Sequence, residues 1–297
     1  MTERKTTLDA TAMSILVACC FLWGLNNVAV KVAIPEVPVL WQAALRSVGG
    51  TLLVWAWASR RGIALFGRDG TLAGGLLAGA LFAAEFICIF VGLQYTTASR
   101  MAVFIYCSPF VVALGMPFIA RNEKLAPAQW AGLVVGFAGV VIAFSEGFTA
   151  APAGPMQWVG DALGIAAGVL WGATTLAIRG TRLSAAPAEK TLFYQLAVSA
   201  VVITAAALAT GAKLPQAVSA LTAASLFYQV VIVVSTSYLL WFWLVRHYPA
   251  TRLASFTLLT PVFGLLLGAL LLHEPVTPRL LAALAAVCAG IWLVNRR

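Results

Sequence analysis

The long apolar runs of this chain contain few residues that could do chemistry. Glu85 is the one carboxylate well inside such a run, and Arg46 lies at a similar depth in the run before it. An ionisable group in a membrane span is costly and is by default a candidate for function. Three roles are open to Glu85: a structural ion pair with Arg46, a partner for a substrate amine or a coupling proton, and a neutral buried acid.

A tryptophan motif occurs twice in the chain. The segment Phe21–Asn27 returns 148 residues later as Val169–Thr175, and such recurrence indicates two copies of one unit. In both copies polar residues follow the tryptophan by three and four positions, so indole and hydrogen-bonding groups share one helix face. Because neighbouring side chains point about 100° apart, we expect one residue of each polar pair to face a cavity. Our choices are Asn27 and Thr174, with Asn26 and Thr175 as equal alternatives.

Trp23 and Trp171 lie near the middle of their runs. About eleven residues at about 1.5 Å each bring them close to the bilayer midplane, too deep for the interfacial aromatic belt. We favour a cavity wall for both, with simple helix packing as the alternative. The other eight tryptophans lie near expected span ends, where the belt accounts for them. They are Trp41, Trp55, Trp57, Trp130, Trp158, Trp241, Trp243 and Trp292.

Aromatic residues and prolines occur in other long runs. With the two midplane tryptophans, Phe86, Tyr106 and Tyr238 would form a pocket suited to apolar or aromatic groups. Pro109 and Pro261 lie mid-run at matched positions. Proline removes a backbone donor and clashes with the previous turn, so both helices should bend there. The bends could be hinges of a gate or static kinks.

The composition is that of an integral membrane protein. Of the 297 residues, 62% are hydrophobic and 10% are charged, with a mean hydropathy of +0.95, whereas globular domains carry about 25% charged residues. The net charge of +9 arises in short connections, so no nucleic-acid partner is expected. The five cysteines lie in apolar runs and are expected as buried apolar residues. The sequence contains no catalytic, metal or cofactor motif, so we do not expect an enzyme.

The uncharged runs predict an all-α protein with ten transmembrane helices. Strands are improbable, because the runs are continuously apolar and longer than a barrel strand. The expected spans are 12–32, 38–58, 71–94, 98–120, 127–146, 159–180, 189–210, 219–245, 250–272 and 276–294.

The basic residues indicate the orientation of these spans. With the amino terminus inside, fourteen lysines and arginines fall on the cytoplasmic side and four on the outer side. Both termini are therefore expected in the cytoplasm. The cytoplasmic set is Arg4, Lys5, Arg60, Arg61, Arg68, Arg121, Lys124, Arg179, Arg182, Lys190, Arg246, Arg252, Arg296 and Arg297. The outer set is Lys31, Arg100, Lys213 and Arg279.

Two further blocks are repeated. Ala98–Ala102 matches Ala250–Ala254 at an offset of 152, and Glu123 matches Glu274 at an offset of 151. We expect both glutamates to be structural, capping a following helix or facing its dipole. Five helices per copy is an odd number, so the second copy must enter the membrane inverted. The expected parts are a cytoplasmic segment 1–11, a five-helix repeat 12–146, a linker 147–158, a second repeat 159–294 and a cytoplasmic end 295–297, with a central cavity between the repeats.

These repeated features carry a family resemblance. A proline within the fourth helix, a glutamate at its end, a proline-bearing turn and a glycine-containing fifth helix resemble the duplicated EamA unit of the drug/metabolite transporter superfamily. Arg46 is similar to that family's arginine in the second helix. The resemblance covers essentially the whole chain, and its Phe-Leu-Trp-Gly start and aromatic-rich central helices are most like the YddG amino acid exporters.

The resemblance implies export of amino acids, with a bias toward aromatic and other neutral ones, across a bacterial cytoplasmic membrane by alternating access. The expected partners are a small-molecule substrate and the lipid bilayer, with no cofactor and no obligate protein partner. One alternative is export of other metabolites or lipophilic cationic drugs. A different alternative is a receptor or scaffold that transports nothing.

Overall fold

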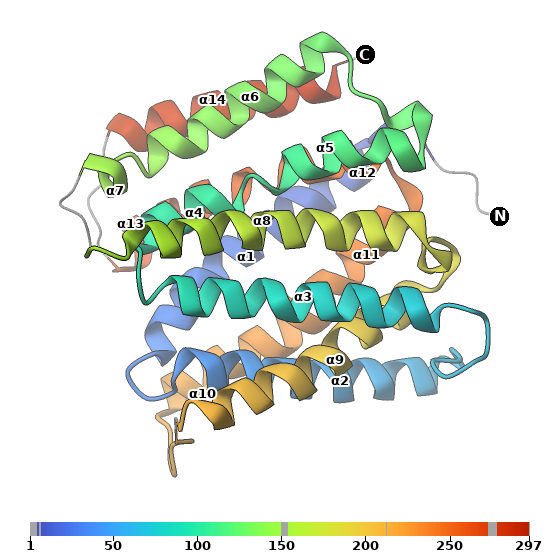
Figure 1. Ribbon diagram of the computed structural model, residues 1–297, viewed down its shortest axis with the longest axis vertical. Helices are drawn as coiled ribbons and strands as arrows, with labels where there is room; N and C mark the ends of the chain where they lie inside the picture. Colours follow the sequence, from blue (N-terminus) through green and yellow to red (C-terminus); the bar gives the residue numbers. More distant parts are fainter. Residues whose placement is uncertain (1–4, 6, 150–153, 212, 273–277, 297) are drawn as a thin grey trace.

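The computed structural model describes residues 5, 7–149, 154–211, 213–272 and 278–296. Within these ranges the chain is helical and contains no strand, as predicted. Figure 1 shows the helices running roughly side by side between the two ends of one bundle.

The helices follow the expected spans closely. In the first half they are α1 (Ala10–Ala33), α2 (Val39–Arg60), α3 (Leu72–Gly92), α4 (Ala98–Ile105), α5 (Ser108–Ile119), the 3₁₀ turn η1 (Arg121–Glu123), α6 (Pro127–Ala143) and α7 (Glu146–Thr149). In the second half they are α8 (Gln157–Gly180), the 3₁₀ turn η2 (Arg182–Ala185), α9 (Ala188–Ala209), α10 (Ala220–Phe227), the π-helix η3 (Tyr228–Ser237), α11 (Tyr238–His247), α12 (Ala250–Phe256), α13 (Leu259–Leu272) and α14 (Pro278–Asn295).

Among the described residues, seven stretches are long and apolar enough to cross a membrane. They are Ala10–Ala33, Leu72–Ile89, Arg100–Ile119, Gln157–Gly180, Ala188–Ala209, Ala220–His247 and Ala250–Gly268. Two shorter apolar helices, Pro127–Ala143 and Leu281–Asn295, accompany them. α2 is a continuous helix of 22 residues over the span expected at 38–58, but the buried Gln42, Arg46 and Ser47 make it less apolar.

Helices from the two halves pack on each other throughout the bundle. α3 packs on α8 and α9, α2 on α9, α1 on α13, and α6 on α14. Gly24 of α1 lets α13 approach closely, since a Cβ there would lie 2.7 Å from the Cβ of Phe263. Gly172 of α8 does the same for α5, where a Cβ would lie 2.6 Å from the Cβ of Val111. Small residues permit such close helix contacts in membranes.

Two of the expected helices are interrupted just before a proline. α4 ends at Ile105 and α5 begins at Ser108, with Pro109 in its first turn, where a missing backbone donor costs nothing. α12 ends at Phe256 and α13 begins at Leu259, two residues before Pro261. The bends predicted near the two prolines are therefore present as breaks in the helices.

The helix expected over 219–245 is also irregular, because its middle third is the π-helix η3. The hydroxyls of Ser235 and Thr236 donate to the carbonyls of Val230 and Val231, five residues back, at 2.7 and 2.8 Å. Bonds of this kind compete with the backbone ladder. π-Helical segments are frequent at functional sites, which directs attention to what η3 touches.

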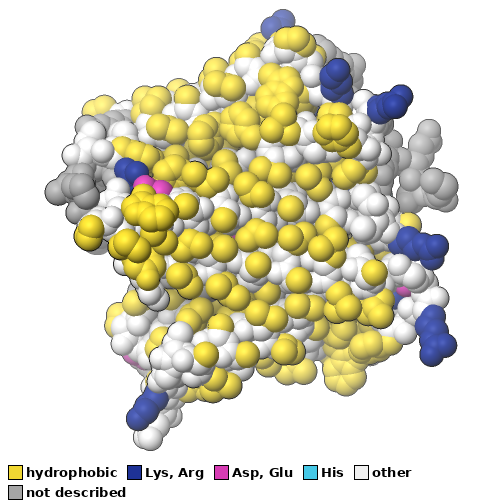
Figure 2. All heavy atoms as spheres, viewed as in Figure 1, with side chains coloured by type: hydrophobic (Ala, Val, Ile, Leu, Met, Phe, Trp, Pro, Cys, Tyr) yellow, Lys and Arg dark blue, Asp and Glu magenta, His cyan; other side chains and the backbone are white. Residues whose placement is uncertain are grey.

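The two ends of the bundle differ in charge. α1 begins and α14 ends at one end, called here the terminal end, whereas α4 and α8 begin at the other, the opposite end (Figure 1). Figure 2 shows Lys and Arg side chains gathered mainly along the terminal end, while the face between the ends is largely hydrophobic. This is the charge pattern that topology signals give to a membrane bundle.

Candidate functional site

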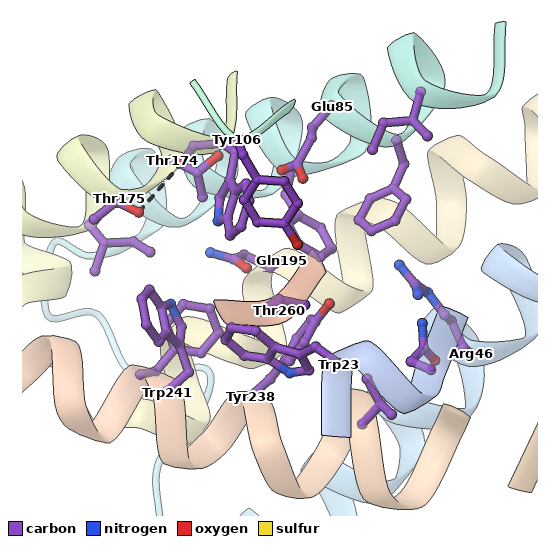
Figure 3. A pocket seen from close by; sticks show the side chains of 18 of the residues that line it. Trp23, Arg46, Glu85, Tyr106, Thr174, Thr175, Gln195, Tyr238, Trp241 and Thr260 are labelled. Atoms are coloured by element: carbon purple, nitrogen blue, oxygen red, sulfur yellow. Dashed lines mark hydrogen bonds between the residues drawn. The ribbon is translucent and has the colours of Figure 1, made fainter. Parts of the chain in front are cut away.

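A cavity of about 220 Å³ lies between the helices of the two halves (Figure 3). Its walls come from α1, α2, α3, α8, α9, η3, α11 and α13, and from Tyr106 in the break between α4 and α5. All eight residues predicted to bind substrate line it. They are Trp23, Asn27, Glu85, Phe86, Tyr106, Trp171, Thr174 and Tyr238. The structure brings these residues together, and their role in binding stays a prediction.

Aromatic rings form much of the cavity wall. The Trp23 ring meets Tyr238 and Trp241 edge to face, with centroids 5.9 and 5.5 Å apart. Tyr106 meets Trp171 in the same way at 5.7 Å. Such contacts orient the rings relative to each other. Both repeated tryptophans therefore lie in the cavity wall and also pack against neighbouring helices.

The π-helix holds Trp23 in place. Trp23 Nε1 donates to the Ser237 hydroxyl at 2.8 Å, and that hydroxyl donates to the Val233 carbonyl at 2.6 Å. Val233 itself lines the cavity. The irregular segment η3 thus forms part of the wall and orients one of its indoles.

Both members of each polar pair line the cavity, so the prediction of one residue per pair is wrong. The cavity borders a broad arc of each helix, so two neighbouring side chains that point about 100° apart can both reach it. Thr174 Oγ1 donates to the Leu170 carbonyl at 2.8 Å. Asn26 Oδ1 has no partner in the described part of the chain. Asn26 and Thr175 therefore join Asn27 and Thr174 as candidate site residues.

Glu85 and Arg46 face the same cavity but do not pair (Figure 3). The Arg46 guanidinium lies over the Phe86 ring, 4.3 Å from its centroid, a cation–π arrangement. Glu85 Oε2 has no hydrogen-bond partner among the described residues. The ion pair that was one of the roles open to Glu85 is thus not formed. The two side chains are 6% and 8% exposed, so the cavity contains a buried acid and a separate buried base.

Gln195 of α9 and Thr260 of α13 also line the cavity, and the sequence reasoning missed both. Gln195 is fully buried, and both atoms of its amide lack a partner among the described residues, as does the Thr260 hydroxyl. The signal was available: each is an isolated polar residue in a long apolar run, where a polar group must find a partner.

The aromatic belt accounts for fewer tryptophans than predicted. Trp41 and Trp241 are each only 7% exposed, Trp41 in a core cluster and Trp241 in the cavity wall. Distance from a helix end does not reveal which face a residue occupies, and both lie on inward faces. Trp158 and Trp292 are 67% and 60% exposed, as a belt position requires.

The cysteines are only partly as expected. All five are free, and Cys19 and Cys20 are buried, but Cys288 of α14 is exposed on the surface of the bundle. An apolar run does not distinguish a core position from one that faces lipid.

A buried ion pair lies between the cavity and the terminal end. Arg179 follows Ile178, which lines the cavity, and its guanidinium pairs with the Glu123 carboxylate. The same guanidinium donates to the Val245 carbonyl at 2.9 Å. Glu123 also accepts from the backbone N–H of Ala250 at 2.6 Å. This one carboxylate therefore joins η1 of the first half to α8 and α12 of the second.

The predicted capping role of Glu123 needs one correction. Glu123 caps the first residue of α12, in the other half of the chain, and not α6, which follows it. The turn η1 directs the side chain into the bundle, where it is almost fully buried. Glu274 lies outside the described residues.

An ion pair at the opposite end also joins the halves. Arg100 of α4 makes a two-point contact with Asp161 of α8, Nη2 to Oδ2 at 2.6 Å and Nε to Oδ1 at 3.0 Å. The Thr96 hydroxyl donates to Asp161 at 2.7 Å, and Phe148 of α7 covers the guanidinium at 4.3 Å. The side chains of this pair are 15% and 16% exposed.

A second polar link at the terminal end connects the α2–α3 loop to α9. The buried Lys190 ammonium donates to the Asp69 carboxylate at 2.8 Å and to the Gly67 carbonyl at 3.2 Å. The Thr71 hydroxyl donates to Asp69 at 2.6 Å. Two hydrogen bonds hold the pKa of Asp69 well below its usual range: the one from Lys190 has the larger effect and the one from Thr71 the smaller.

Comparisons with known proteins agree with this fold. The profile of the EamA-like transporter family matches residues 10–145 and again 158–296. The chain is 27% identical to an uncharacterized transporter, YvbV, of Bacillus subtilis, over all of this chain and 94% of that protein. It is 25% identical to a probable amino-acid metabolite efflux pump of Salmonella typhimurium, over 92% of this chain and 90% of that protein.

A solved crystal structure has the same fold, with a TM-score of 0.81 at 21% identity over 97% of each chain. The two family matches together cover nearly the whole sequence and correspond to the two repeated halves. The chain is a multi-pass membrane protein of the EamA-like transporter family.

Proposed function

We propose that this transporter exports amino acids, chiefly aromatic and other neutral ones, through its central cavity. In this proposal ten spans form two inverted five-helix repeats, 12–146 and 159–294, in a bacterial cytoplasmic membrane with both termini inside. The doubled family match and the basic terminal end support this arrangement. The site would be exposed alternately to the two sides as the repeats rock against each other.

The observation that carries the proposal is the buried acid and the separate buried guanidinium that face the same cavity. A free amino acid is a zwitterion, with an ammonium and a carboxylate on one carbon. Glu85 would accept from the ammonium, and the Arg46 guanidinium would donate to the carboxylate. Since the two side chains do not hydrogen-bond to each other, each is available to the opposite charge of a substrate.

Side-chain amide atoms without a hydrogen-bond partner could also bind the substrate. Gln195 offers both a donor and an acceptor to the cavity, and Asn26 offers an acceptor. A buried polar group without a partner costs free energy. A polar substrate that pairs with these atoms would recover that cost, whereas a wholly apolar one would not.

The size and lining of the cavity favour a metabolite over a drug. A volume of about 220 Å³ is below the roughly 300–1,000 Å³ of pockets for drug-sized ligands. The rings of Trp23, Tyr106, Trp171, Tyr238 and Trp241 would receive an apolar or aromatic side chain. The relative described as an amino-acid metabolite efflux pump points to the same class of substrate.

Pro109 and Pro261 would act as hinges in this mechanism. Each follows a break in a helix that reaches the cavity: Tyr106 lies in the first break, and Thr260 lies next to Pro261. Rotation at these breaks would change the width of the cavity at one end without unwinding a helix.

The test is counterflow in proteoliposomes. Proteoliposomes that contain the purified protein are loaded with unlabelled phenylalanine, and their uptake of labelled phenylalanine, methionine or threonine is measured. We expect uptake that depends on protein and falls at least tenfold in Trp23→Ala plus Trp171→Ala, while Trp158→Ala, at an exposed position, retains it. Absence of uptake for every amino acid, with uptake of a lipophilic cation instead, would establish the drug-export alternative. Absence of any solute movement would favour the scaffold.

A further inference from the structure

The ionisable groups and the threonines of the central cavity lie at different depths in the bundle. Arg46 lies about two turns after the start of α2, and Glu85 about two turns before the end of α3, so both lie toward the opposite end. Thr174 and Thr175 lie within about two turns of the end of α8, toward the terminal end. Figure 3 shows the same separation, with the two threonines on one side of the cavity and Arg46 on the other. The cavity therefore has an ionisable pole, formed by Arg46 and Glu85, and a neutral pole around the threonines.

Gln195 of α9 belongs to the neutral pole. It lies about two turns after the start of α9, which is at the terminal end. The side chain is fully buried, and neither Oε1 nor Nε2 has a hydrogen-bond partner among the described residues. Such an amide in the interior of a membrane protein is costly until it finds a partner. Gln195 thus presents an acceptor and a donor to the neutral pole of the cavity (Figure 3).

The threonine hydroxyls of this pole differ from the Gln195 amide. Thr174 Oγ1 and Thr175 Oγ1 donate to carbonyls of their own helix, at 2.8 and 3.5 Å. Their protons are therefore used within α8, whereas both atoms of the amide are available to a molecule in the cavity.

An apolar wall lies beside the amide. Trp241 and Phe242 of α11 and Ile178 of α8 line the cavity at the same pole. Trp241 is oriented by an edge-to-face contact with Trp23, whose ring centroid is 5.5 Å away. An aromatic side chain in this part of the cavity would pack on these residues, and a polar group at its far end would meet Gln195.

Within the proposed export of amino acids, on which this step depends, we infer that Gln195 selects substrates whose ring carries a hydrogen-bonding group. The ammonium and carboxylate would lie at the ionisable pole, and the side chain would extend to the neutral pole. A phenolic hydroxyl would donate to Gln195 Oε1 and accept from Nε2, and an indole N–H would donate to Oε1. A phenyl ring would leave the amide unpaired, and sites that hydrogen-bond a substrate hydroxyl reject analogues that lack it. Tyrosine and tryptophan are therefore preferred over phenylalanine.

The experiment is competition for counterflow of labelled phenylalanine by unlabelled tyrosine, phenylalanine and 4-methylphenylalanine. The last compound resembles tyrosine in shape but cannot hydrogen-bond at the end of its ring. We expect tyrosine to compete at about tenfold lower concentration than phenylalanine, as one or two added hydrogen bonds would give. 4-Methylphenylalanine should compete no better than phenylalanine. This series needs only the wild-type protein, so it does not depend on the folding of a variant.

Gln195→Met then tests the residue itself, because methionine is unbranched and of similar length but offers no amide. The advantage of tyrosine should fall to within about twofold, while exchange of phenylalanine continues. Ser199→Ala is the matched control. Ser199 lies about one turn further along α9, is fully buried and also lacks a partner among the described residues, but it is outside the cavity lining. This variant should retain the advantage of tyrosine.

Three results would overturn the role of Gln195 while leaving the proposed export intact. They are equal competition by tyrosine and phenylalanine in the wild type, an advantage that 4-methylphenylalanine shares, and an advantage that survives Gln195→Met. Absence of exchange for every amino acid would instead overturn the proposed function, and the role of Gln195 with it.

Discussion

The two ends of the bundle carry different kinds of ion pair on the same helix. α8 carries Asp161 near its first turn and Arg179 near its last, and each pairs with a residue of the first half. The Arg179–Glu123 pair is almost fully buried and is joined to backbone groups of α11 and α12. The Arg100–Asp161 pair is partly exposed to solvent.

This difference bears on the proposed alternating access, in which one end of the bundle opens at a time. A partly exposed pair loses little when it separates, because water replaces each partner. A buried pair cannot lose one partner without leaving an uncompensated charge. In the proposed transport cycle the opposite end should therefore open at lower cost than the terminal end.

The largest effect is expected at the buried pair. Glu123→Gln should lower the free energy of unfolding by about 3–5 kcal/mol, because it leaves the Arg179 charge buried without its partner. Unfolding of the purified protein in mixed detergent micelles measures this loss. The double variant Glu123→Gln plus Arg179→Gln should cost less than the two single variants added together. A loss below about 1 kcal/mol for Glu123→Gln would mean that the buried pair stabilises the protein no more than a surface pair does. The two ends would then not differ in the way described.

A smaller effect is expected at the partly exposed pair. Asp161→Asn should cost about 1–3 kcal/mol, since it weakens hydrogen bonds to a charged group that water can partly replace. The substitution should also favour the state open at the opposite end, because that is the state in which the Arg100–Asp161 pair is separated. Labelling of Thr175→Cys in the cavity by a membrane-impermeant maleimide should then quicken about fivefold, for a shift of about 1 kcal/mol.

The same labelling sharpens the comparison between the ends. With the maleimide added on the terminal side instead, Glu123→Gln could quicken labelling from that side more than Asp161→Asn quickens it from the opposite side; the terminal end would then be the one that opens more readily, and the order of the two ends must be reversed. Ser219→Ala provides a control, because its hydroxyl bonds Glu36 at the opposite end without an ion pair between helices.

The smallest effect is expected at the Asp69–Lys190 link. The pKa of Asp69 is lowered by Lys190 and Thr71, so folding favours the ionised form. The contribution to stability is therefore complete above the unfolded pKa of about 4 and is lost as the pH falls through the lower folded pKa. The difference in melting temperature between the wild type and Asp69→Asn should shrink as the pH is lowered from 5 to 3. A constant difference over that range would show that the link does not depend on charge.

Much of the fold could be predicted because hydrophobic run length is a direct consequence of bilayer thickness. The helix positions, the absence of strands in the described ranges and the breaks near the two prolines all follow from local sequence. The π-helix could not be predicted, because it depends on hydroxyl bonds of Ser235 and Thr236 that another rotamer would not make.

Part of the site could also be predicted from the long apolar runs. Polar or ionisable residues in apolar runs are few, and those chosen from the sequence line one cavity. Gln195 carries the same signal and was overlooked. Trp241 could not be placed, because run length gives depth but not the direction in which a side chain points. The pairing of Glu123 with Arg179 also depends on tertiary contacts between halves that no local pattern encodes.

In the proposed site Glu85 and Arg46 together recognise a zwitterion. This claim is tested most directly by competition in the phenylalanine counterflow assay, using phenethylamine, which lacks the carboxylate, and hydrocinnamic acid, which lacks the ammonium. We expect that neither analogue competes at concentrations at which phenylalanine does. We also expect Glu85→Gln and Arg46→Gln each to reduce phenylalanine exchange at least tenfold. Phenethylamine that competes as well as phenylalanine, with exchange unaffected by Arg46→Gln, would contradict the claim and identify a transporter of cations.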